Sequence, residues 1–180
     1  MNGTSSASTQ PRQLPAANVD ALAGKYLTFR LAREEYGLPI LTVREIIGLV
    51  NITPVPRAPH EIRGVINLRG KIISVVDLRR KFGMSDTEAL PETCIVVVNI
   101  NALEESLDMG ILVDSVSEVL DVKKEDIGPP PSFGKTISTD FILGMAKLEN
   151  RVAILLEIEK LLTTSDLSVG KSNDIEAAVV

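Results

Sequence analysis

The chain is poor in the side chains on which most enzymes and small secreted folds depend. Its 180 residues include one cysteine, one histidine and no tryptophan. A single cysteine excludes an internal disulfide framework and fits a reducing compartment. His60 lies in a polar loop, so metal sites and nucleophilic triads lack the residues they need. Cys94 lies in an apolar run, where it is expected to behave as a small hydrophobic residue. We therefore expect no enzyme, no cofactor and no metal.

Long apolar segments and an excess of positive charge are also missing. No run approaches the roughly 18–20 apolar residues that a membrane helix requires. The N-terminus has neither the basic start nor the apolar core of a secretory signal. A net charge of −5 argues against nucleic acid, because phosphate binding needs concentrated Lys and Arg. The sequence therefore predicts a cytoplasmic protein that neither inserts into a membrane nor binds nucleic acid.

What is present is a large aliphatic fraction: 44% of the residues are apolar, but only 3% are aromatic. The apolar residues fall in short runs separated by Gly and Pro turns, such as YLTFRL (26–31) and CIVVVNI (94–100). Runs of this length, rich in β-branched residues, are typical of strands in small barrels or sandwiches. We expect an all-β fold with a few short helices.

The ends of the chain differ in composition from its middle. Residues 1–24 are rich in Ser, Thr, Ala, Asn and Pro and are expected to form a disordered leader, because they bury too little apolar surface to offset chain entropy. Residues 164–180 are expected to form a flexible tail. The folded domain is expected at 25–163.

The folded part contains a diverged internal repeat. YGLPILTVREI (36–46) resembles MGILVDSVSEV (109–119), and both segments precede a proline-rich loop and a final apolar hairpin. Two repeats predict two small barrels that share an interface. We expect one subdomain at about 36–90 and the other at about 91–155, with the N-terminal strand and the C-terminal helix packing across them.

Short helices are predicted from local signals. Thr42–Glu45 and Ser115–Glu118 fit the capping-box pattern, which predicts one helical turn after each. Asp77 is expected to be a helix N-cap rather than a general acid. Leu78–Phe82 and Glu159–Leu162 are expected to form helical caps after the last strand of each repeat.

The most informative segment is IRGVINLRGKIISVVDLRRKFG (62–83). Two β-rich runs flank Asn-Leu-Arg-Gly, in which Asn67 and Gly70 tolerate the positive φ angles of a tight hairpin turn. Such a turn would present Arg69 at a rigid tip. An arginine at a tip is commonly a solubilising charge only, and Glu45 could be fully used as a helix cap. However, the second repeat has Glu149-Asn150 in place of Arg69-Gly70. Unlike charges at equivalent tips suit binding to two different partners, or to one partner in a chain of alternating modules.

These motifs, together with YGLPILTVREIIG (36–48) and STDFILGMAKLENRVAILLEIEKLL (138–162), resemble those of the CheW-type coupling proteins of bacterial chemotaxis. The resemblance covers about 25–162. It implies two intertwined five-stranded barrels of SH3-like topology, the CheW-like fold, and an adaptor without catalytic activity.

The resemblance also implies partners and a binding site. The partners would be the regulatory domain of the histidine kinase CheA, at the ends of the barrels, and the cytoplasmic hairpin tips of methyl-accepting chemoreceptors, in an apolar groove between them. The protein would be recruited to receptor arrays at the inner membrane. The binding residues carried onto this chain are Val43, Glu45, Gly64, Asn67, Leu68, Arg69 and Gly70. The alternative reading is a generic two-barrel interaction module or scaffold in another chemosensory-type system.

Overall fold

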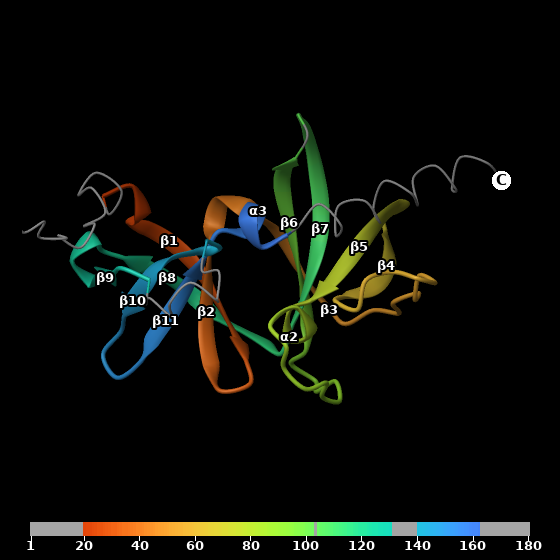
Figure 1. Cartoon of the computed structure of the whole chain (residues 1–180), viewed down its shortest axis with the longest axis horizontal. Coiled ribbons are helices and arrows are strands. Elements are labelled where there is room, and N and C mark those ends of the chain that lie inside the picture. Colours follow the sequence, from red (N-terminus) through yellow and green to blue (C-terminus); the bar gives the residue numbers. More distant parts are fainter. Residues whose placement is uncertain (1–19, 103, 131–139, 163–180) are drawn as a thin grey trace, which may run out of the picture.

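The computed structural model describes residues 20–102, 104–130 and 140–162, and their regular structure is mainly β-strand (Figure 1). Barrel one is a five-stranded sheet, in the order β3 (Val43–Gly48), β6 (Cys94–Ala102), β7 (Glu105–Val113), β5 (Lys71–Asp77) and β4 (Ile62–Leu68). Barrel two is a six-stranded sheet, in the order β8 (Ser115–Val122), β1 (Gly24–Leu31), β2 (Glu34–Pro39), β11 (Val152–Leu156), β10 (Ile142–Lys147) and β9 (Ile127–Gly128). The short helical segments are η1 (Ile40–Thr42), α2 (Leu78–Lys81), η2 (Lys124–Asp126) and α3 (Ile158–Leu161).

The two sequence repeats exchange strands, because the first hairpin of each repeat joins the barrel formed by the rest of the other repeat. The β6–β7 hairpin lies between β3 and β5 in barrel one, and the β1–β2 hairpin lies between β8 and β11 in barrel two. Each inserted hairpin makes one parallel contact with its host, β7 with β5 and β2 with β11. The predicted intertwined all-β fold is confirmed. The division at about residue 90 does not coincide with the two sheets, because β6 and β7 follow that residue but complete barrel one.

The internal repeat appears in the geometry as well as in the sequence. Strand register shifts at the same place in both repeats, between Ile62 and Gly64 in one and between Ile142 and Gly144 in the other. Next to these shifts, Thr53 pairs with Val65, and β9 pairs with β10. The two-residue length of β9 makes barrel two six-stranded, whereas the corresponding contact of Thr53 is a single bridge.

Apolar side chains form three clusters because the strands alternate their faces. A small cluster fills each barrel, around Ile66 and Val97 in barrel one and around Ala153 and Leu155 in barrel two. The largest cluster draws on both barrels and includes Phe29 from β1 and other buried residues from β6 and β7. The two barrels therefore share a core in addition to having one each.

Both predicted capping boxes are wrong as helix starts. Thr42 ends η1 by donating its Oγ1 hydrogen to the carbonyl of Pro39 over 2.7 Å, and the chain continues as strand β3. Ser115–Glu118 lies entirely within β8. Strand pairing overrides the local pattern because each segment lies beside an inserted hairpin with which it pairs.

The folded part begins earlier than expected. Residues 20–22 are helical and β1 starts at Gly24, so residues 20–24 are not disordered leader. Leu22 packs against the core of barrel two, and its carbonyl accepts a hydrogen bond from the Tyr26 hydroxyl over 2.5 Å. The rest of the predicted leader, residues 1–19, and the tail, 164–180, lie outside the described residues.

The predicted N-cap at Asp77 is confirmed, and it gives a stability test with a matched control. The Asp77 carboxylate accepts from the backbone amides of Arg79 and Arg80, whereas Glu157, at the equivalent place before α3, makes no side-chain capping bond. Asp77→Ala is therefore expected to lower the free energy of unfolding by about 1–2 kcal/mol, and Glu157→Ala by less than about 0.5 kcal/mol. Urea denaturation of both variants measures this difference, and equal midpoints would contradict it.

Candidate functional site

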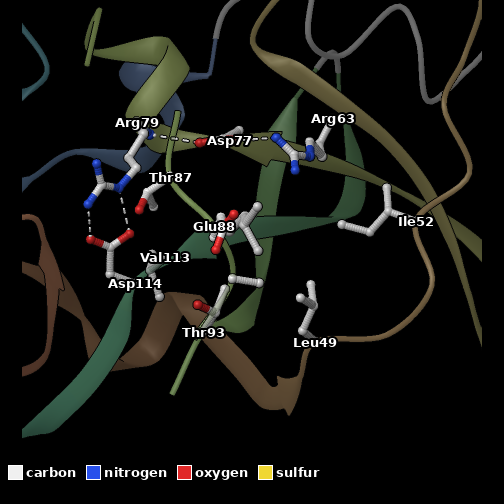
Figure 2. A pocket seen from close by; sticks show the side chains of 12 residues that line it. Leu49, Ile52, Arg63, Asp77, Arg79, Thr87, Glu88, Thr93, Val113 and Asp114 are labelled. Atoms are coloured by element: carbon white, nitrogen blue, oxygen red, sulfur yellow. Dashed lines mark hydrogen bonds and ion pairs between the residues drawn. The ribbon is translucent and has the colours of Figure 1, made fainter. Parts of the chain in front are cut away.

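A small pocket of about 60 Å³ lies beside α2 and the end of β7. Figure 2 shows two pairs of opposite charges in it: Arg79 contacts Asp114, and Arg63 contacts Asp77. Within the described ranges, no group of three or more His, Cys, Asp or Glu side chains could hold a metal ion. The arginines of this pocket are thus engaged within the molecule, and the predicted binding residues lie elsewhere.

The β4–β5 hairpin builds the predicted recognition tip. Leu68 ends β4 and Lys71 starts β5, so the turn consists of Arg69 and Gly70, with φ of 53° and 82°. Positive φ at both central residues is what a two-residue turn of type I′ requires. Asn67 stays in the strand, and its Oδ1 accepts from the Gly70 amide over 2.9 Å. The expected hairpin is confirmed, but Arg69 rather than Asn67 takes the positive φ.

The structure brings two of the predicted residues together. Both terminal nitrogens of Arg69 donate to the Glu45 carboxylate, over 2.6 and 2.8 Å, although 24 positions separate the two residues. The Arg69 side chain is 74% exposed and that of Glu45 is 27% exposed. Glu45 is therefore employed in a bidentate ion pair at the surface, and the alternative that it caps a helix is excluded.

Four residues that the sequence did not single out surround this pair. Asp108 on β7 forms an ion pair with Arg44 over 3.1 Å and accepts hydrogen bonds from Lys71 over 3.2 Å and from Asn99 over 2.7 Å. Burial by itself would raise the pKa of Asp108, but the hydrogen bonds from Asn99 and Lys71 outweigh it and lower the pKa. The surface formed by Arg44, Glu45, Asn67, Arg69, Gly70, Lys71 and Asp108 is called rim one below.

The other predicted residues are placed differently. Val43 is half-buried against the shared core, and Leu68 is half-buried against the core of barrel one. Gly64 is five residues from Arg69 along β4, which at roughly 3.3 Å per residue separates it from the tip by about 16 Å. There it lies against the backbone of Thr53. Gly64 thus lies away from the turn and in contact with another segment of its own barrel.

The Glu45–Arg69 pair predicts a titration behaviour. The hydrogen bond from Arg69 lowers the pKa of Glu45 below its ordinary value of 4.5. Because the folded-state pKa is the lower one, the pair is fully formed above that value and is lost as the pH falls through the lowered pKa. In an NMR titration we expect the Glu45 side chain to show a midpoint below 4.5 and Arg69→Gln to raise that midpoint. An unchanged midpoint in the variant would show that the pair does not form in solution.

The described chain is thus a pair of strand-exchanged β-barrels with a preformed ion pair at one hairpin rim. The CheW-like domain family matches residues 25–166. The chain is 39% identical to the chemotaxis protein CheW of Klebsiella aerogenes, over 85% of this chain and 93% of that protein. It is 35% identical to the chemotaxis protein CheW of Rhizobium meliloti, over 84% of this chain and 90% of that protein.

A solved structure agrees with these relatives. The crystal structure of the scaffolding protein TtCheW from Thermoanaerobacter tengcongensis aligns with a TM-score of 0.69 and 38% identity, covering 79% of this chain and 94% of that chain. The chain belongs to the CheW-like domain family, and it is a coupling adaptor of chemotaxis. In the described part of the chain, no helix is long and apolar enough to cross a membrane.

Proposed function

We propose that this adaptor links methyl-accepting chemoreceptors to a histidine kinase of the CheA type and catalyses no reaction itself. Its rim one abuts the regulatory domain of the kinase, and the cytoplasmic hairpin tips of the receptors bind between the barrels. The protein works in the cytoplasm and is recruited to receptor arrays at the inner membrane. Family membership and the preformed Glu45–Arg69 pair support this proposal.

The backbone conformation of Arg69 is the main support for a binding role. A φ of 53° is unfavourable for a residue with a Cβ and costs of order 1 kcal/mol, whereas glycine or asparagine would adopt it readily. An exposed ion pair contributes only about 0–1 kcal/mol to stability. Folding alone thus gives little reason for an arginine at this position. A fixed, outward-facing guanidinium gives a reason, because binding then orders fewer rotamers.

The equivalent rim of barrel two has different charges. There Arg151 contacts the buried carboxylate of Glu35 over 2.5 Å and the exposed carboxylate of Glu118 over 3.3 Å. Glu149 replaces Arg69 in the sequence. This surface, formed by Glu35, Glu118, Glu149 and Arg151, is called rim two. Because charge complementarity selects partners, the two rims favour different contacts within one assembly.

Reconstitution tests the proposal directly. Receptor-containing membranes, a CheA-type kinase and this chain are combined, and kinase autophosphorylation is measured with and without receptor ligand. The chain is expected to raise receptor-controlled autophosphorylation above the level of receptor and kinase alone. An unchanged rate at saturating chain concentration would overturn the coupling role.

A further inference from the structure

Asp108 contacts residues that lie close to Glu45 and Arg69 in the sequence. Arg44 directly precedes Glu45, and Lys71 follows Arg69 by two residues. The Asp108 side chain is only 13% exposed; it forms an ion pair with Arg44 and accepts hydrogen bonds from Lys71 and Asn99. One half-buried carboxylate on β7 therefore connects β3, the start of β5 and β6.

A β-bulge allows Arg44 and Glu45 to act on the same side of β3. Val43 pairs with Val98 and Glu45 with Val97, so Arg44 is an extra residue in the strand. Adjacent residues of a regular strand point to opposite faces, but a bulge re-aims one of them. Here Arg44 reaches Asp108 while Glu45 reaches Arg69.

Barrel two has the same device in a simpler form. Its bulge lies at the equivalent place, where Leu27 pairs with Val119 and Phe29 with Val116. A single cation, Arg151, contacts both the buried acid and the acid of the bulge, Glu35 and Glu118. In rim one two cations divide these contacts, Lys71 with Asp108 and Arg69 with Glu45. An acid beneath the hairpin is thus common to both barrels, whereas a tip arginine that pairs with the acid of the bulge is particular to rim one.

Stability does not explain this arrangement. The cations that contact Asp108 are more than half exposed, at 57% for Arg44 and 59% for Lys71. Exposed pairs of this kind contribute little to folding because water and salt screen them. They do connect β3 and the start of β5 to the same carboxylate, close to the residues that form the Glu45–Arg69 pair.

We propose that Asp108 is a positioning residue for partner recognition: through Arg44 and Lys71 it holds β3 and the β4–β5 turn so that the Glu45–Arg69 pair is formed before the partner arrives. The predicted effect of Asp108 on partner binding rests on the proposed function. Its predicted effect on the Glu45–Arg69 pair in the free protein does not depend on that function.

The first experiment follows the Arg69 side chain in the free protein. A guanidinium whose two terminal nitrogens pair with a carboxylate rotates slowly and gives resolved, slowly exchanging Nη–H signals in NMR spectra. Asp108→Asn is expected to speed the exchange of these hydrogens about tenfold, because neighbouring interactions of this kind are coupled. Asp86→Asn, which removes the partner of Arg80 in the same barrel, is the matched control and is expected to leave the signal unchanged. An unchanged Arg69 signal in a folded Asp108→Asn protein would overturn the proposal.

Lys71→Gln provides a second variant if Asp108→Asn fails to fold, because it leaves Asp108 with Arg44 and Asn99. It is expected to loosen the Arg69 signal in the same direction, and no change would overturn the proposal.

The second experiment measures affinity for the kinase regulatory domain. Asp108→Asn is expected to weaken binding about tenfold in the native background and to have no further effect in an Arg69→Gln background, since it acts through the pair. Equal losses in both backgrounds would show an independent contact and overturn the positioning role. If the native chain does not bind the domain at all, the proposed function fails, while the NMR result still decides whether Asp108 orders the pair.

Discussion

Replacing Arg69 by glutamate is expected to weaken binding to the kinase regulatory domain by at least about 30-fold, equivalent to about 2 kcal/mol. The substitution removes the bidentate donor and places a second carboxylate beside Glu45, so the two side chains repel instead of pairing. The free energy of unfolding should change by no more than about 0.5 kcal/mol, because the side chain is exposed. Isothermal titration calorimetry together with thermal unfolding measures both quantities.

Arg33→Glu is the matched control for this charge reversal. Arg33 lies exposed in the turn between β1 and β2 of barrel two, so it is also an arginine of a hairpin turn. Its reversal changes the net charge by the same amount and is expected to leave the affinity within about twofold, because long-range charge effects are screened. If Arg69→Glu binds as well as the native chain, Arg69 is a solubilising charge and rim one is not the kinase contact.

The sequence allowed prediction of those features that depend on local pattern. Asn67 and Gly70 around a short turn predicted the β4–β5 hairpin, and the Asp77 carboxylate before a basic segment predicted the N-cap of α2. Both depend on residues within a few positions of one another, where turn and capping chemistry act. The internal repeat likewise predicted two similar barrels.

The exchange of strands could not be predicted from pattern in the same way. The apolar run of β6 fits a strand covered on both faces, but nothing in it specifies which strand it pairs with. The capping-box predictions failed for a related reason, since Thr42 and Ser115 have suitable local sequences but lie where an inserted hairpin needs a pairing partner. Tertiary pairing outweighs a local preference of about 1 kcal/mol.

The candidate site was predicted as a set of residues, but not as an arrangement. The family resemblance supplied both Glu45 and Arg69, and only the structure shows that they pair. Asp108 was missed because it is a single acid in a strand, between the apolar residues Leu107 and Met109. One signal could have pointed to it: in the alignment of the repeats Asp108 corresponds to Glu35 and Lys71 to Arg151, so an acid and a base recur together at both places.

Gly64→Ala is expected to give the largest loss of stability among single substitutions in this region. A Cβ at Gly64 would lie 2.1 Å from the carbonyl oxygen of Thr53, and the glycine has a φ of 148°. Neither the strand nor the crossing segment can move easily, because Thr53 and Val65 exchange two backbone hydrogen bonds of 2.9 Å. We expect a loss of more than about 3 kcal/mol, or failure to fold.

Two glycines provide a graded control for this substitution. A Cβ at Gly48 meets nothing within 4 Å, and one at Gly144 lies 3.0 Å from the carbonyl oxygen of Gly128. The urea midpoint should therefore be highest for Gly48→Ala, lower for Gly144→Ala and lowest for Gly64→Ala. The free energy of unfolding of Gly48→Ala should lie within about 0.5 kcal/mol of that of the native chain. A Gly64→Ala protein as stable as Gly48→Ala would contradict the backbone role. If that stable Gly64→Ala protein also failed to bind the kinase domain, Gly64 would be a site of close partner approach. The added methyl group would then block the partner without disturbing the fold.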